Sequence, residues 1–146
     1  MMSEPKKRVT IQLKTTIQDG QEREENQLEA IGFFFNKKGL DVLHFTEKLD
    51  DDAEVSTLVT IQTEKISIKR SGAVSMHQQF RLGQKTETVY QHPHGHIHME
   101  TYTKQIVYYP PSKGLARLAI DYTVRLNGQS ARNHILELQF IEEDCE

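Results

Sequence analysis

The chain has 146 residues, of which 36% are hydrophobic and 27% charged, and its formal net charge is −3. This length is that of one domain, and the balance of hydrophobic and charged residues excludes a disordered chain. A weakly acidic chain offers no long basic face, so we expect no nucleic-acid partner.

Hydrophobic and polar residues alternate along most of the chain, and this period of two predicts β-strands. We expect eight to ten strands joined by short connections, with no helix. The alternating segments are 9–17, 26–36, 43–47, 55–61, 66–70, 74–80, 86–91, 97–109, 118–124 and 136–140. Asp19-Gly20 is a tight-turn signal, and the Pro-rich segment 110–114 is expected to be a loop.

Regularly spaced strands with one apolar face indicate a sandwich or a barrel, and short turns between sequence neighbours favour an up-and-down order. We therefore predict an all-β fold, a closed antiparallel up-and-down β-barrel of eight to ten strands, because closure removes exposed edges. A single barrel domain is expected over residues 1–146, with flexible tails at 1–7 and 142–146.

The turn at Asn127-Gly128 can be tested against the faces of its two strands. A two-residue turn would bury Glu137 and expose the apolar side chains Leu136, Leu138 and Phe140. A three-residue loop with a Gly bulge puts the apolar faces of the two strands on the same side, and we adopt it. The expected pairs are Tyr122 with Arg132 and Ile120 with His134.

Two further features concern the compartment. Cys145 is the only cysteine, which excludes an internal disulfide and a Cys-rich zinc site. The first nine residues show no signal peptide, and no apolar run could span a bilayer. We expect a cytoplasmic protein without a membrane partner.

Several polar residues share a strand face with apolar neighbours. Glu47 and Arg70 each follow two apolar residues at period two. If the apolar faces point into a barrel, these charges need partners, so the two side chains are expected to form an interior salt bridge. The candidate ligand-binding residues are Glu47, Thr57, Arg70, Gln78, Tyr122, Arg132 and His134. The alternative is an internal network that only satisfies itself or reaches water at the barrel mouth.

Small or polar residues on inward faces predict space inside the barrel, because a barrel filled for stability would use bulky aliphatic side chains. These residues are Ala30, Gly32, Thr57 and Thr101. We therefore expect non-enzymatic binding of a small-molecule ligand inside the barrel. The alternative is a protein-interaction or homodimerisation module that uses the barrel as a scaffold. An aromatic stretch at 102–111 would either form such an interface or cap the barrel.

Four histidines of the same parity, His92, His94, His96 and His98, are weak candidates for metal ligands. Pro93 and Gly95 predict a hairpin turn between them, and the last two alternate with apolar residues and should face solvent. We expect no metal and no cofactor.

No nucleophile elbow, phosphate-binding loop or zinc-protease motif occurs in the chain. An interior with Glu, Arg and His could still support acid–base chemistry, so an enzyme is the least favoured alternative.

The segment RSGAVSMHQQF at residues 70–80, with Gly32-Phe33-Phe34-Phe35, Glu47, Gly95 and Tyr122, resembles the YwiB-like family of uncharacterised bacterial proteins over nearly the whole chain. The resemblance implies a closed antiparallel barrel similar to the lipocalins and other calycins, and it implies no activity. The histidine run at 92–98 departs from the family pattern.

Overall fold

The structure is a computed structural model that describes residues 6–49 and 52–143. These residues form ten strands, a number that lies within the eight to ten that were expected, and each of the ten alternating segments overlaps one of them. The strands are β1 (Lys7–Asp19), β2 (Glu22–Lys37), β3 (Leu40–Lys48), β4 (Glu54–Ile61), β5 (Lys65–Gly72), β6 (Met76–Arg81), β7 (Lys85–His92), β8 (Gly95–Ser112), β9 (Leu115–Leu126) and β10 (Arg132–Glu142). Over the described ranges, no helix has the length and apolar character needed to cross a membrane.

The strands form one antiparallel sheet in the order β6-β5-β4-β3-β2-β1-β10-β9-β8-β7. The sheet curls until β6 comes close to β7 and β8. Two isolated bridges cross this line: Ser75, just before β6, pairs with Gln91 of β7, and Leu82, just after β6, pairs with Thr103 of β8. We call this line between β6 and the β7–β8 hairpin the seam. The predicted up-and-down barrel is therefore confirmed, and it is nearly closed.

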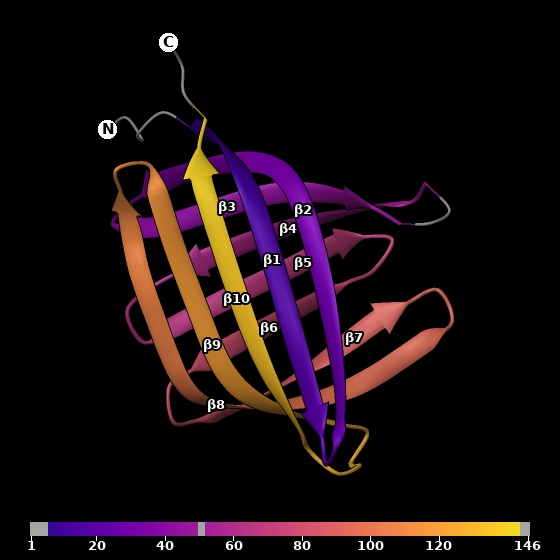
Figure 1. Ribbon diagram of the computed structural model, residues 1–146. Helices are drawn as coiled ribbons and strands as arrows, with labels where there is room; N and C mark the ends of the chain where they lie inside the picture. The colour runs from indigo at the N-terminus through magenta and orange to yellow at the C-terminus, as the bar shows by residue number, and fades with distance from the viewer. Residues whose placement is uncertain (1–5, 50–51, 144–146) are drawn as a thin grey trace.

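Two layers of strands cross in the barrel (Figure 1). β1, β10, β9 and much of β8 run down one side, whereas β3 to β7 run across the other, and β2 bends from the first layer to the second. β2 pairs with β1 from Glu22 to Phe34 but with β3 only from Gly32 to Lys37. Pairing with β3 stops at Gly32–Phe45, and we call the point where β2 leaves β3 the fork.

Gly32 is required where the strands come together at the fork. A Cβ atom at this position would collide with the backbone oxygen of His44 and would lie 2.8 Å from the Cδ1 atom of Ile11. Only glycine lets the backbones approach this closely.

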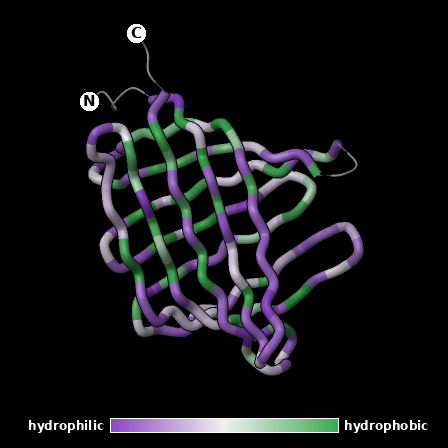
Figure 2. The backbone as a smooth tube through the Cα atoms, viewed as in Figure 1, coloured by the Kyte–Doolittle hydropathy of each residue, from purple (hydrophilic) through white to green (hydrophobic). Residues whose placement is uncertain are grey.

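The inward faces of the strands form one core, and the alternation that produces it is visible along the chain in Figure 2. The aromatic rings of Phe34 and Phe140 lie 5.0 Å apart, and those of Phe80 and Tyr122 meet edge to face at 4.8 Å. Partly buried apolar side chains pack against this core. They are Leu13, Leu28, Ala30, Ile68, Met99, Ile106, Tyr108 and Leu126.

The β9–β10 connection differs in part from the prediction. Asn127 and Gly128 both have positive φ, 49° and 74°, and the Gln129 amide donates to the Leu126 carbonyl at 2.9 Å, as in a tight two-residue turn. Leu136, Leu138 and Phe140 are buried, as expected. The predicted pairs are wrong by two residues: Tyr122 pairs with His134, and Ile120 with Leu136. The third residue of the predicted loop was placed before Asn127-Gly128, whereas it follows them, on the β10 side of the turn.

β8 continues through Pro110 and Pro111, which were predicted to lie in a loop. The register of β8 and β9 shifts between Tyr109 and Ser112, so this irregular stretch does not need the amide hydrogen that proline lacks. The predicted tails lie mostly outside the described residues. At their inner limits Lys7 and Glu142 belong to strands and form an ion pair at 3.5 Å.

A polar contact links β8 to the start of β3. The Tyr108 hydroxyl donates to the Asp41 carboxylate at 2.7 Å, and the Asn36 amide donates to the other oxygen at 2.8 Å. Burial, followed by the bond to Asp41, raises the pKa of Tyr108 above its ordinary value. Of the aromatic stretch, Tyr108 thus caps the barrel, whereas Tyr102 and Tyr109 are exposed.

Candidate ligand-binding site

The predicted salt bridge between Arg70 and Glu47 is confirmed, and it lies at the fork. The last pair of β2 and β3 is Gly32 with Phe45. The next inward-facing residues beyond this pair are Ala30 of β2 and Glu47 of β3, and they are not paired. Arg70 of β5 donates from Nη2 to Glu47 Oε1 at 2.6 Å. Their side chains are 25% and 18% exposed, so the pair is largely buried but still reaches solvent.

Thr57 lies on β4 between the strands that carry these two charges. Its cross-strand partners are Phe45 and Arg70. The side chain is buried, and its Oγ1 atom has no hydrogen-bond partner among the described residues. A buried hydroxyl without a partner is costly, and a ligand or ordered water ordinarily satisfies it. The fork therefore places a cation, a carboxylate and an unsatisfied hydroxyl on one inner surface.

A second group of polar residues lines the inside of the seam. The Gln78 amide donates to Thr101 Oγ1 at 2.9 Å, and both side chains are buried. Thr103, two residues further along β8, is fully buried, and its Oγ1 atom also lacks a partner in the described part of the chain. The sequence analysis missed Thr103, although it continues the inward parity of Met99 and Thr101.

Tyr122 and His134 are inward-facing cross-strand partners whose rings stack at 5.2 Å. Burial raises the pKa of Tyr122 above its ordinary range. Burial, followed by the charge of Arg132, lowers the pKa of His134. Arg132 itself is not an interior residue: its exposed side chain lies 3.5 Å from Asp19, because the strand end lets it reach solvent.

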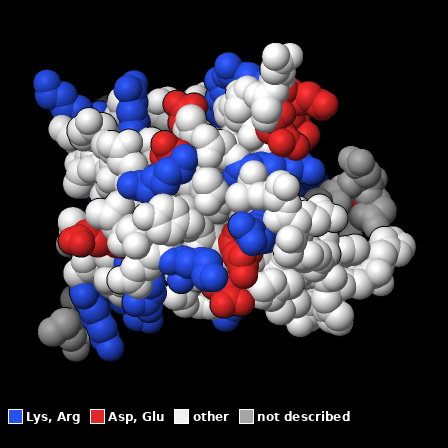
Figure 3. Space-filling model, turned by 90° about the horizontal axis from the view of Figure 1, so that it is seen from below, with Lys and Arg blue, Asp and Glu red and all other residues white. Residues whose placement is uncertain are grey.

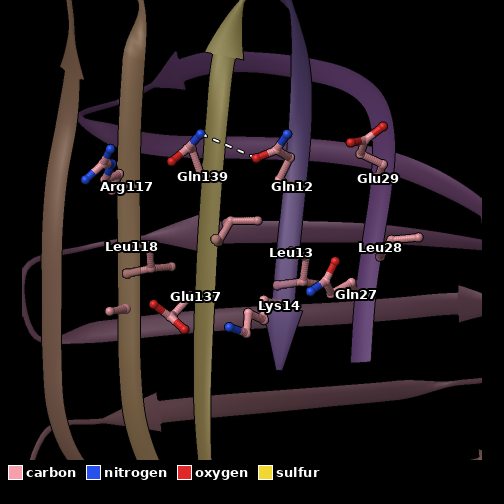
Figure 4. A pocket seen from close by; sticks show the side chains of 12 residues that line it. Gln12, Leu13, Lys14, Gln27, Leu28, Glu29, Arg117, Leu118, Glu137 and Gln139 are labelled. Atoms are coloured by element: carbon pink, nitrogen blue, oxygen red, sulfur yellow. Dashed lines mark hydrogen bonds between the residues drawn. The ribbon is translucent and has the colours of Figure 1, made fainter. Parts of the chain in front are cut away.

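The small inward-facing residues do not leave the space that was expected of them. The space beside Gly32 is filled by the close approach of two strands, and the space beside Thr101 is filled by the Gln78 amide. A hollow of about 710 Å³ lies instead on the outside of the β2-β1-β10-β9 surface, where Gln12 and Gln139 face it (Figure 4). Another, of about 510 Å³, is lined by residues of the turns that include Gly39 and Glu64. Neither hollow lies inside the barrel.

The histidine run forms the expected turn. His94 and His96 are exposed, and the turn lies between His92 and Gly95. The described residues contain one group with metal-ligand spacing, Glu87, His98 and Glu100, whose ligand atoms lie within 4.8 Å of one another. Lys85 and Arg125 lie 3.8 and 3.7 Å from Glu100, so cationic side chains already compensate this carboxylate.

Two Ser–His pairs lie on the outer face of the barrel. His44 is 2.8 Å from the Ser56 hydroxyl, and His77 is 2.7 Å from the Ser67 hydroxyl. In the part of the chain that the structure describes, no hydrogen bond joins either imidazole to a carboxylate that could orient it as a general base.

Basic and acidic side chains are interspersed on the lower surface of the barrel (Figure 3). This face carries no continuous basic patch of the kind that binds nucleic acid.

The fork is the place where the described residues combine charge, partial burial and unused hydrogen-bonding capacity.

Comparisons with known proteins agree on the fold. The family described as "Domain of unknown function (DUF1934)" matches residues 11–138. The uncharacterised β-barrel protein YwiB of Bacillus subtilis (strain 168) is 27% identical over 133 residues, which cover 90% of this chain and 92% of YwiB. The crystal structure of the B. subtilis ywiB protein is similar with a TM-score of 0.85 and 24% identity, over 97% of this chain and 96% of that one.

Proposed function

Because the chain belongs to the DUF1934 family of YwiB-like β-barrel proteins, whose function is not defined, we propose from the geometry of the fork that it binds a small polar ligand there. The observation that carries this proposal is the largely buried Arg70–Glu47 pair beside the unsatisfied hydroxyl of Thr57. The cytoplasm, which suits a chain with one cysteine, is the compartment we propose.

Three properties of the fork support binding. The guanidinium of Arg70 has five N–H donors and uses one of them in the described bond to Glu47. The pair remains partly accessible, so a ligand can reach it without unfolding the barrel. The half-buried apolar side chains of Ala30 and Ile68 lie on the same inner face and can cover an apolar part of a ligand.

The test is native mass spectrometry of the protein purified from its own host. We expect a small molecule that stays bound to the wild type and is lost from Arg70→Lys, which keeps the charge but not the planar donor fork. Arg117→Lys, on the outer face, is the matched control and should retain it. A wild-type protein that carries no small molecule, or equal retention by both variants, would contradict the proposal.

The second candidate function is an interaction module, and an exposed apolar row on the outer face favours it. Ile31, Phe33 and Ile141 are 53%, 43% and 41% exposed. Ile31 and Ile141 are both cross-strand partners of Thr10, so they lie in one row. A homodimer through this row predicts a doubled mass in light scattering, which Ile31→Lys should restore to that of a monomer. A monomeric wild type would argue against it.

A further inference from the structure

The charges of the fork restrict the kind of ligand that can bind there, and this argument rests on the proposed function. Arg70 and Glu47 form a neutral pair, with each side chain at least three-quarters buried. A ligand that binds one of these two side chains weakens the contact of that side chain with the other. The charge left behind then loses its partner in a largely desolvated site, which is strongly unfavourable.

A singly charged ligand therefore fits the fork poorly. A carboxylate alone would draw Arg70 away and leave Glu47 uncompensated, and an ammonium alone would do the reverse to Arg70. A ligand that brings both charges keeps each protein charge paired and gains charge-assisted hydrogen bonds at both ends. The Thr57 hydroxyl is buried next to Arg70 across the strands, and it would donate to the same carboxylate once the ligand opens the packing around it.

From this balance of charge we propose that the ligand is a zwitterion, with a carboxylate bound by Arg70 and Thr57 and an ammonium bound by Glu47. A free α-amino acid has this chemistry. The adjoining inner surface is apolar: Ile68 precedes Arg70 on the same face of β5, and Ala30 is the next inward-facing residue of β2 beyond its last pair with β3. The fork therefore favours an amino acid with an apolar side chain.

Isothermal titration with three compounds that share one apolar tail tests this inference. They are leucine, 4-methylpentanoate, which lacks the ammonium, and 3-methylbutylamine, which lacks the carboxylate. We expect wild-type protein to bind leucine at least tenfold more tightly than either singly charged analogue. Equal or tighter binding of either analogue, or no binding of leucine, overturns the inference.

The variant Glu47→Gln gives a readout that a merely structural role would not produce. It keeps the shape of the side chain but removes its charge, so leucine should bind more weakly and 4-methylpentanoate more tightly, each by at least threefold. Glu137→Gln, exposed on the outer face, should change neither affinity. If Glu47→Gln weakens both compounds equally, the zwitterion inference fails. Melting curves of both variants report whether the barrel is still folded.

The two proposals can fail separately. If native mass spectrometry finds a bound molecule that is purely anionic or neutral, the fork binds a ligand but not a zwitterion. If it finds no bound molecule while leucine still binds by titration and Glu47→Gln weakens that binding, the fork binds a zwitterion, and the proposed function fails only for a ligand retained through purification.

Discussion

Removing Arg70 should destabilise the barrel by leaving the Glu47 carboxylate without its partner. Truncating one member of a fully buried pair costs about 3–5 kcal/mol, whereas an exposed pair contributes about 0.2–1 kcal/mol. The side chains here are 25% and 18% exposed, which places them between these limits. We expect Arg70→Ala to lower the free energy of unfolding by about 2 kcal/mol.

A double-mutant cycle in urea isolates the contact itself. Arg70→Ala, Glu47→Ala and the double variant should give a coupling energy of about 1–2 kcal/mol, because the double variant leaves no unpaired charge. In thermal melts, Arg70→Ala should lower Tm by about 4–8 °C for a chain of this size.

The outer-face pair of Arg125 and Glu100 supplies the control. Its atoms are 3.7 Å apart and the arginine is 50% exposed, so Arg125→Ala should cost less than about 1 kcal/mol. A coupling energy for Arg70 and Glu47 below about 0.5 kcal/mol would show that water already screens the pair, and the charge argument for the fork would then be refuted.

Three further variants test other parts of the structure. Gly32→Ala should lower the free energy of unfolding by about 1–3 kcal/mol, because the added Cβ meets the backbone oxygen of His44; an unchanged urea midpoint would contradict the close approach. Tyr108→Phe removes a hydrogen bond to a carboxylate and should cost about 1–3 kcal/mol, and a neutral effect in the same assay would show that Tyr108 does not cap the barrel. Burial lowers the pKa of His134 below its usual 6.5, so the unfolded chain takes up a proton more readily and the wild type should lose stability as pH falls below about 6.5. His134→Gln should lose less between pH 7.5 and 5.5, and parallel pH profiles of the two proteins would count against this.

Much of the fold could be predicted because alternation at period two is a local property of the chain. It gave ten strands and the inward parity of Glu47 and Arg70, and the cost of a lone buried charge then required that they meet. The same parity, extended by two residues along β8, could have identified Thr103.

What could not be predicted depends on contacts between distant strands. Alternation assigns a face to Gly32 but does not reveal that two backbones meet there, so a small residue was taken as a sign of empty space. Arg132 has the inward parity, but only the end of β10 shows that its side chain reaches water. The position of the fork depends on where β2 bends, which no local pattern records.

The position of the seam has a consequence for how the chain could be reconnected. β1 and β10 pair at the centre of the sheet, and Val9 lies opposite Glu142, so the two described ends of the chain are neighbours. The gap in the hydrogen-bond ladders lies instead between β6 and β7, which residues 82–84 connect. A circular permutant that joins the present ends and opens between β6 and β7 would keep every strand ladder, and the fork would lie in the C-terminal half of the new chain.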